Sequence, residues 1–191
     1  MEENNIKEFD FVVVKYDKDN YKLIEQVYRL HKDQHRKIFD LASNISTDED
    51  IMDYIEMLIK SNNTLVFAAI DKETEDVAAV LIMSDICLYN NVVVRTNCHL
   101  VVCRKYWGKT SRDIIKQFFN KMDNEFITKV IRYEAYVPSN NFGIIKLLKD
   151  VGFKCEGTLK DRLVFYNKDG KPKKYDELIF SKINKGVEID E

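Results

Sequence analysis

Apolar residues recur along the chain with two different periods, and these periods predict strands that alternate with helices. The first strand is expected from Phe9 to Lys15, where β-branched and aromatic residues follow one another. A long helix is expected from about Tyr21 to Leu41, because its apolar residues recur at helical spacing. Ser46 and Glu49 form a capping-box pattern before a second helical stretch that contains Ile51. The N-terminal part is therefore predicted as a strand and two helices.

Shorter apolar runs dominate the rest of the chain and predict further strands around two more helices. The turn residues DKETED separate two strands of a predicted hairpin, Thr64 to Ile70 and Val77 to Asp85. A strand from about Val92 to Arg104 leads into a helix with one apolar face, formed by Ile114, Ile115, Phe118, Phe119 and Met122. The last predicted elements are a strand from Lys129 to Val137, a helix from about Ser139 to Val151 that ends at Gly152, and strands from Phe153 to Tyr166 and from Tyr175 to Ile183.

The predicted order of elements is β-α-α-β-β-β-α-β-α-β-β. The strand–helix–strand passage in the middle implies a parallel pair with a right-handed crossover, whereas the hairpins on either side imply antiparallel strands. We therefore expect an α/β (α+β) fold with a mixed central sheet and helices on both faces. Because no linker, repeat or low-complexity tract interrupts residues 1–191, one domain is expected, with a polar tail at residues 185–191.

Composition and charge narrow the class of protein. With 45% hydrophobic and 32% charged residues, the chain is typical of a folded globular protein and not of a disordered one. The net charge of −2 provides no basic field that would attract nucleic acid. No apolar run reaches the roughly 18 residues that span a bilayer, and the acidic N-terminus lacks the pattern of a secretory signal. We expect a cytoplasmic protein that binds neither nucleic acid nor membrane.

Cysteine and histidine positions argue against a metal site. The cysteines are Cys87, Cys98, Cys103 and Cys155. They form no CxxC pair, so we expect no zinc ribbon but four small, reduced and buried hydrophobic residues. His31 and His35 are four residues apart, but the glutamate of an HExxH motif is missing between them. A solvated helix face is the expectation for these two histidines.

Two segments of the chain, residues 99–119 and residues 137–159, resemble the signature regions of the GNAT (Gcn5-related) N-acetyltransferase superfamily. His99 to Phe119, HLVVCRKYWGKTSRDIIKQFF, resembles the strand, loop and helix that bind acetyl-CoA. Val137 to Leu159, VPSNNFGIIKLLKDVGFKCEGTL, resembles the ribosomal-protein-acetylating (RimJ/RimL-like) branch. In that branch an Asn precedes a helix that ends in Gly-Phe, and Glu-Gly follows. Those places are held here by Asn141, Gly152, Phe153, Glu156 and Gly157.

The element order extends this resemblance to most of the chain and implies the GNAT acyl-CoA N-acyltransferase fold. The histidine-bearing strand and the Tyr-Trp-Gly-Lys loop also resemble phage-encoded members of the superfamily. The resemblance implies an acetyl-CoA-dependent N-acetyltransferase, in which an amine attacks the thioester directly and no metal takes part. The acceptor would be a protein N-terminus, a lysine or a small amine, and the enzyme a monomer or homodimer. The alternatives are a GNAT-fold binding or structural protein without catalysis, and an enzyme that uses another acyl-CoA.

The loop of the first signature segment has the physical properties of a diphosphate site. The chain turns at Gly108 and a helix begins near Thr110, where unpaired backbone N–H groups and the helix dipole favour an anion. The preceding strand can pair its backbone with the amide-rich pantetheine arm of acetyl-CoA. The backbone N–H near Val102 is the hydrogen-bond donor expected for the oxyanion that develops on the thioester oxygen during acetyl transfer. The residues expected to bind the cofactor are Val101, Val102, Lys105, Trp107, Gly108, Lys109, Thr110, Ser111, Arg112 and Asn141.

This loop departs from the family pattern Arg/Gln-x-x-Gly-x-Gly/Ala. Trp107 takes the first position, Thr110 the place of a glycine that lets phosphate approach the backbone, and Arg112 the small second position. A threonine there either donates its hydroxyl to phosphate or crowds the site, and Asp113 is expected to bring a negative charge into the first helical turn. These departures favour the non-catalytic alternative. Asn141 has two interpretations, a cofactor contact and an N-terminal helix cap.

Three side chains are candidates for proton transfer. His99 lies on the strand that leads into the cofactor loop, and a histidine titrates in the range that suits a base at neutral pH; the alternative is a structural histidine. Glu134 alternates with Arg132 and Tyr136 on the adjacent parallel strand, as a base or as a plain surface partner of Arg132. Tyr136 is a weaker candidate, as an acid. The tyrosine acid of many family members falls on Leu148 in this chain.

Overall fold

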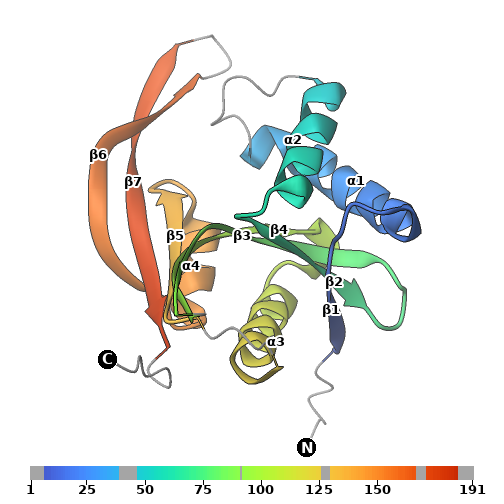
Figure 1. The fold of residues 1–191 in the computed structure, drawn as a ribbon. Helices are drawn as coiled ribbons and strands as arrows, with labels where there is room; N and C mark the ends of the chain where they lie inside the picture. The colour runs from blue at the N-terminus through green and yellow to red at the C-terminus, as the bar shows by residue number, and fades with distance from the viewer. Residues whose placement is uncertain (1–6, 39–46, 91, 126–129, 167–170, 185–191) are drawn as a thin grey trace, which may run out of the picture.

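The structure is a computed structural model that describes residues 7–38, 47–90, 92–125, 130–166 and 171–184 (Figure 1). Its elements follow in the predicted order, which is thereby confirmed. They are β1 (Phe9–Val13), α1 (Tyr21–Ile38), α2 (Asp48–Lys60), β2 (Leu65–Asp71), β3 (Val77–Tyr89), β4 (Val92–Val102), α3 (Lys109–Glu125), β5 (Arg132–Pro138), α4 (Phe142–Asp150), β6 (Lys154–Tyr166) and β7 (Pro172–Ile183), with short 3₁₀ turns η1 (Lys18–Asn20) and η2 (Arg104–Tyr106).

The strands form one mixed sheet in the order β1-β2-β3-β4-β5-β7-β6. The pairs β1–β2, β2–β3, β3–β4, β5–β7 and β6–β7 are antiparallel. In contrast, β4 and β5, which are connected through α3, run parallel to each other. The prediction of a mixed sheet with a parallel pair in the middle is confirmed. Because β7 inserts between β5 and β6, the last hairpin joins the sheet through its second strand.

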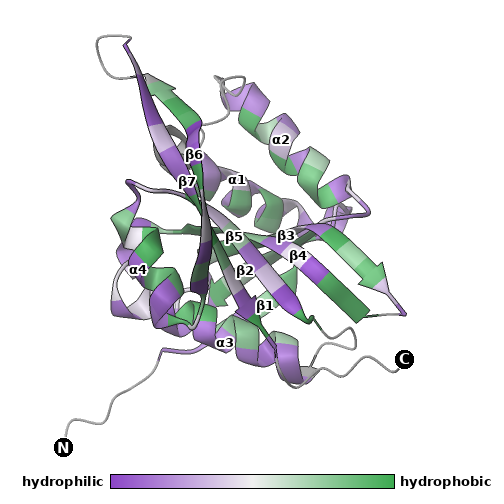
Figure 2. Ribbon diagram, turned by 90° about the vertical axis from the view of Figure 1, so that its left-hand side faces the viewer, coloured by the Kyte–Doolittle hydropathy of each residue, from purple (hydrophilic) through white to green (hydrophobic). Residues whose placement is uncertain are grey.

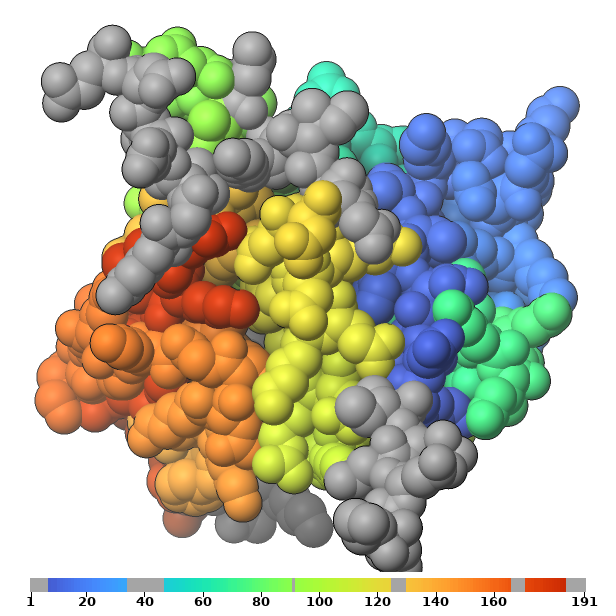
Figure 3. Space-filling model, turned by 90° about the horizontal axis from the view of Figure 1, so that it is seen from below, coloured from blue at the N-terminus to red at the C-terminus, as the bar shows by residue number. Residues whose placement is uncertain are grey.

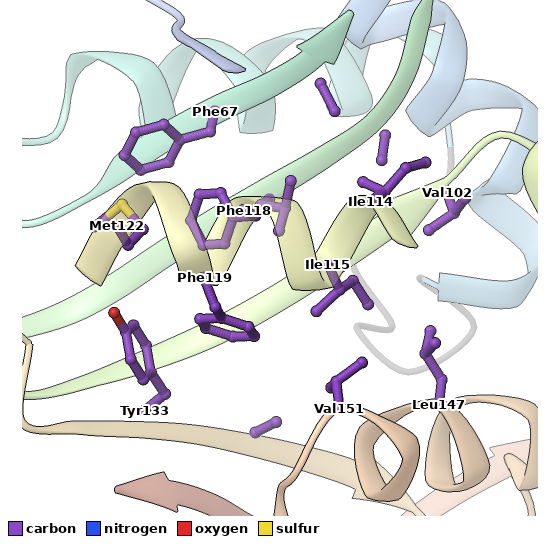
Figure 4. Packing of buried hydrophobic residues seen from close by; sticks show 14 of the residues in the cluster. Phe67, Val102, Ile114, Ile115, Phe118, Phe119, Met122, Tyr133, Leu147 and Val151 are labelled. Carbon is purple, nitrogen blue, oxygen red and sulfur yellow. The ribbon is translucent and has the colours of Figure 1, made fainter. Parts of the chain in front are cut away.

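Helices cover both faces of this sheet (Figure 1). One core lies between α1, α2 and the sheet, and residues such as Val27, Ile55 and Val80 have almost no exposed surface there. The other core lies under α3 and α4, where Phe118 packs 5.2 Å from Phe67 and Phe119 packs 4.7 Å from Tyr133, measured between ring centroids (Figure 4). The predicted apolar face of α3 is confirmed, because all five of its residues are buried.

The helices alternate apolar and polar bands along their length, as Figure 2 shows for α2. α2 begins with a capping box one residue later than the predicted one: the hydroxyl of Thr47 accepts from the Asp50 N–H, and the Asp50 carboxylate accepts from the Thr47 N–H. The predicted C-terminal stop of α4 is confirmed. Gly152 has a φ of +93°, a left-handed conformation that glycine adopts at little cost.

Two predicted boundaries next to the candidate site were wrong. The strand expected to reach Arg104 ends at Val102, because the chain enters η2, where the Tyr106 hydroxyl donates to the buried Asp71 carboxylate. The helix expected from Ser139 begins at Phe142. Both changes lengthen the loops that precede α3 and α4.

The expected solvated histidine face was also wrong for His31, which is buried with its Nδ1 2.8 Å from the Val27 carbonyl oxygen. The side chain of His35 lies outside the described residues. The expectation of four buried cysteines was wrong as well, because Cys87 and Cys155 are exposed and Cys98 and Cys103 are only partly buried. Over the described ranges, no helix is long and apolar enough to cross a bilayer. The same ranges contain no group of three His, Cys, Asp or Glu side chains close enough to hold a metal ion.

Candidate active site

The candidate site lies where β4 and β5 separate. Thr96 pairs with Tyr133 and Asn97 pairs with Glu134, and beyond this second pair the described residues of the two strands no longer face each other in the ladder. β5 continues along β7 to Pro138, whereas β4 continues along β3 to Val102. After Asn97, the side of β4 that faces β5 therefore has no paired strand up to the end of β4 at Val102.

The register between β3 and β4 determines which backbone groups face this opening. The Cys103 N–H donates to the Ala78 carbonyl at 2.9 Å, so these opposed residues form a hydrogen-bonded pair. Opposed pairs alternate in an antiparallel ladder. The N–H and C=O groups of Cys98, Leu100 and Val102 therefore point away from β3 and toward β5; we call them the β4 edge.

Of the two strand residues expected to meet the pantetheine arm, Val102 belongs to the β4 edge and Val101 does not. By the same alternation, Val101 exchanges its backbone hydrogen bonds with Val80, and its side chain is buried against α1 and α2. Cys98 and Leu100 were missed as cofactor candidates, because the sequence alone does not reveal the register with β3.

A small apolar cavity of about 40 Å³ lies beside the β4 edge. Its walls come from β3 and β4, from α3, from α4, and from Phe153 in the link between α4 and β6. The lining residues include Cys98, His99, Leu100, Ile115, Leu148 and Phe153. The cavity has room for several atoms, and its lining suits an apolar group and not an ion. Burial raises the pKa of the Cys98 thiol to about 12, so this cysteine is a neutral wall of the cavity.

α3 begins immediately after the turn at Gly108, whose φ of +87° confirms the predicted turn. α3 begins at Lys109, and the first N–H groups of an α-helix point out of its N-terminal end and not to an acceptor in a preceding turn. Thr110 is partly buried, and the buried Ser111 donates its hydroxyl to the Gly108 carbonyl at 2.8 Å. Because α3 starts at Lys109, the expectation of Asp113 in the first turn was wrong, and that turn contains no acidic residue.

The cations near this helix start already have acidic partners. The Lys105 ammonium lies 2.7 Å from the Asp76 carboxylate, which is the main reason that its pKa is raised. Arg112 lies 3.3 Å from Asp150 at the end of α4 and so joins α3 to α4. These helices meet on the face shown in Figure 3, where α3 occupies the middle and α4 lies beside it. Lys109 is exposed at the first position of α3.

Trp107 links the loop back to the β4 edge. Its indole Nε1–H donates to the Val102 carbonyl oxygen at 3.0 Å, although about half of the side chain is exposed. The start of α3 is thereby held against the end of β4. The tryptophan that replaces the first residue of the family pattern thus contacts the strand that the resemblance assigns to the cofactor.

Asn141 caps α4, because its side-chain oxygen accepts from the Ile144 N–H at 3.3 Å. The cap interpretation is therefore confirmed. The cap uses only the side-chain oxygen of Asn141, so the side-chain NH₂ group is the part of the residue that a cofactor contact would use. Phe142, the first residue of the helix, is 76% exposed, which leaves this end of α4 open to solvent.

The three candidates for proton transfer lie on one face of the sheet, next to the point of separation. Glu134 belongs to the last parallel pair, Tyr136 follows two residues later on β5, and His99 follows two residues after Asn97 on β4. Side chains two residues apart in a strand share a face, and Tyr133 on the opposite face packs under α3. The sequence-predicted residues therefore converge on the sheet face that carries α1 and α2.

The surroundings of His99 and Tyr136 shift the pKa values of these two side chains in opposite directions. His99 is exposed at the surface, yet the protein atoms around its ring lower its pKa, and the nearby charge of Asp85 partly opposes this effect. Desolvation and then the Glu134 charge raise the pKa of Tyr136. At neutral pH His99 is therefore neutral and able to accept a proton, whereas Tyr136 holds its proton.

Sequence reasoning missed two members of this polar group, Glu156 and Ser181. The Arg132 guanidinium contacts both Glu134, at 2.7 Å, and Glu156, and the Ser181 hydroxyl donates to Glu156. The predicted pair of Arg132 and Glu134 is confirmed, but Glu134 is buried, so it is not a plain surface pair. The Glu-Gly pattern at Glu156 was the only signal in the sequence for this residue. It did not reveal the contact with Arg132, because Arg132 lies on β5 and Glu156 on β6, which is distant in the sequence.

The sequence matches no family model and no curated protein. Solved structures, in contrast, match over most of the chain. Spermidine N-acetyltransferase from Vibrio cholerae in complex with CoA and spermine has a TM-score of 0.66 and 12% identity, over 91% of this chain and 95% of that one. Ribosomal-protein-S5-alanine acetyltransferase from Vibrio fischeri has a TM-score of 0.67 and 18% identity, over 93% of both chains.

A third similar structure is the microcin C7 self-immunity acetyltransferase MccE in complex with acetyl-CoA and AMP. Its TM-score is 0.62 and its identity 17%, over 85% of this chain and 88% of that one. The TM-scores show a shared fold, and identities this low show the fold alone. The chain therefore has the fold of the GNAT N-acetyltransferases.

Proposed function

We propose that this protein transfers the acetyl group of acetyl-CoA to an amine. The observation that carries the proposal is the β4 edge, which points its N–H and C=O groups into the opening beside β5 and ends next to the first turn of α3. Donors and acceptors along a strand suit the amides of a pantetheine arm. A helix N-terminus suits the diphosphate that follows them.

The residues present fit such a donor in two further respects. Gly108 turns the chain from η2 into α3, and no acidic residue lies in the first turn of that helix. The apolar cavity beside Cys98 and Leu100 suits the uncharged acyl end. The donor supplies a thioester carbonyl, and the Val102 N–H is our candidate for hydrogen bonding to its oxygen.

The side chains beside the opening provide the proton transfers that amine acetylation requires. A protonated amine has no free electron pair, so a base must first take its proton. We assign this role to His99, because its lowered pKa keeps it neutral, with Glu134 as the second candidate. Tyr136, with its raised pKa, is the candidate that returns a proton to the departing thiolate. The C–N bond then forms as the C–S bond breaks.

The acceptor is proposed to approach over the sheet face that carries His99, Glu134 and Tyr136. In Figure 1 this face lies between the helices α1 and α2 and the hairpin β6–β7. The similar structures include acetyltransferases named for spermidine and for the alanine of ribosomal protein S5, both amine acceptors. The Asn141, Gly152-Phe153 and Glu156-Gly157 pattern supports the RimJ/RimL-like branch and an amine on a protein as acceptor.

The rival proposal is a binding or structural protein without catalysis. It is favoured by one observation: Lys105 and Arg112 already face Asp76 and Asp150, so the cationic charge near the helix start is partly neutralised. Calorimetric titration with acetyl-CoA separates the two proposals. We expect saturable binding and, with a panel of amines and peptides, release of free CoA. Absence of binding at high micromolar protein would exclude the enzyme.

A further inference from the structure

We propose that Arg132 is a positioning residue that orients Glu134 toward Tyr136 at the point where β4 and β5 separate. This inference rests on the proposed function and adds to it the group that fixes the geometry of proton transfer. The side-chain partners of Arg132 among the described residues are Glu134 and Glu156, so it acts on the opening through Glu134.

The guanidinium of Arg132 divides its donors between two carboxylates. Its Nε–H donates to Glu134 Oε1 at 2.7 Å, and its terminal nitrogens donate to Glu156. The Tyr136 hydroxyl lies 3.3 Å from the other oxygen of Glu134, Oε2. Arg132 therefore fixes one oxygen of Glu134, and the second oxygen is presented to Tyr136.

Burial explains why this arrangement is rigid. The Glu134 side chain is only 9% exposed, and a carboxylate with so little water around it requires a cation and hydrogen bonds. Arg132 supplies both: its Nε–H donates to Glu134, while the terminal nitrogens of the same planar fork are held by Glu156, which sets the direction from which Glu134 is contacted. A lysine at this position would keep the charge but lose the fork.

Glu156 holds the other side of Arg132 by means of a β-bulge. Cys155 pairs with Phe180 and Gly157 with Ile179, so Glu156 is the extra residue between two consecutive pairs. A bulge redirects a side chain, and here the carboxylate reaches Arg132 and accepts from the Ser181 hydroxyl. Both contacts lower the pKa of Glu156, Arg132 more strongly. The chain of contacts runs from Ser181 through Glu156, Arg132 and Glu134 to Tyr136.

This series of side-chain contacts differs from an ordinary cross-strand network in its location. Glu134 is the last residue of β5 that pairs with β4, and Tyr136 is partly exposed just beyond it. Glu134 and Tyr136 thus lie on the sheet face that the proposed reaction uses, next to the point where β4 and β5 separate.

A double-mutant cycle tests the inference in the intact chain. The variants are R132K, E134Q and the double variant, assayed for kcat, for the KM of acetyl-CoA and for their pH profiles, with thermal unfolding measured in parallel. We expect E134Q to lower kcat about 100-fold and R132K at least about tenfold, in line with the range for general acid–base catalysis. In the E134Q background, R132K should cost no further activity, and KM for acetyl-CoA should stay within about twofold throughout.

Two controls guard against effects on folding. R29K alters an exposed arginine that pairs with Glu25 on α1 and should leave all parameters unchanged. E156Q removes the outer partner of Arg132 and should lower kcat less than R132K does, with the same KM. R132Q is avoided as the main variant, because it leaves a buried carboxylate without its cation.

The outcomes separate the inference from the proposed function. If the wild type binds and turns over acetyl-CoA but R132K keeps wild-type kcat at every pH, or loses equally in both backgrounds, Arg132 has no positioning role and the enzyme proposal stands. If the wild type binds no acetyl-CoA, both fall.

Discussion

Asn97 on β4 and Glu134 on β5 form the last pair of the parallel ladder, and the two strands part immediately beyond them. This one pair determines much of the site. It leaves the edge formed by Cys98, Leu100 and Val102 facing an opening, and it places His99 and Tyr136 on the same face within two residues. The proposed cofactor contact and the proposed proton-transfer group therefore both lie at a single break in the sheet.

Gly108 is predicted to be required for diphosphate binding. Its φ of +87° lies in the left-handed region, where an alanine costs about 1–2 kcal/mol, although the space around it is open. The Gly108→Ala variant should relieve this strain by rotating the first-turn amides of α3. Each displaced hydrogen bond costs about 1 kcal/mol, or about fivefold in affinity. Calorimetry with CoA measures the loss.

The chain contains a matched control for this variant. Gly152 has nearly the same φ, +93°, and equally open surroundings at the end of α4. Gly152→Ala should therefore lower thermal stability by a similar amount and keep the affinity for CoA. Equal loss of affinity in both variants would show that the effect is one of stability and not of the amides.

The pH profile should reveal His99 as the base. Because surrounding protein atoms lower its pKa, the acidic limb of kcat/KM should lie below the ordinary histidine value of about 6.5. Activity is lost as the pH falls through that limb, since the ring becomes protonated. Asp85→Asn removes the charge that favours the protonated ring and should move the limb to still lower pH. His99→Ala should lower kcat about 100-fold and keep CoA affinity; unchanged turnover would remove His99 from the mechanism.

Asn141 allows its two roles to be separated. Asn141→Ala removes the cap on the Ile144 N–H and should cost about 1 kcal/mol of stability. Asn141→Ser keeps a capping oxygen but removes the side-chain NH₂ group. We expect this variant to keep its melting temperature within about 1 °C, since serine caps as well as asparagine, and to bind CoA more weakly. Wild-type affinity in Asn141→Ser would leave Asn141 as a cap alone.

Trp107 is a built-in probe of the cofactor loop, because it is the single tryptophan of the chain. Its indole donates to the Val102 carbonyl on the β4 edge, where a pantetheine amide would also bind. CoA should change the emission of Trp107 with the same Kd that calorimetry gives. Trp107→Phe should abolish the signal while CoA still binds. A fluorescence signal that does not saturate with binding would place the cofactor elsewhere.

The order of the elements was predictable because each strand and helix carries its own local signal. The period of the apolar residues, the turn DKETED and the stop at Gly152 depend on neighbours in the chain. Boundaries were less predictable where two caps compete within a few residues. The structure uses Thr47 and Asp50 in place of Ser46 and Glu49, and starts α4 after Asn141 in place of Ser139.

The site was predictable to the extent that it depends on such local signals. The convergence of His99, Glu134 and Tyr136 followed from assigning two neighbouring parallel strands. The positions of Leu100 and Glu156 were not predictable, because they depend on the register with β3 and on a bulge against β7. The partners of Lys105 and Arg112 are 29 and 38 residues away in the sequence. Contacts over such separations leave no periodic trace in one sequence.

The most direct test of the account is an amide ¹H–¹⁵N titration of the labelled protein with CoA. The account predicts that the largest shifts fall on the amides of Leu100, Val102 and residues 109–112, while the amides of β2, on the far side of β3, stay in place. Shifts confined to other parts of the chain, or none at saturating CoA, would contradict it.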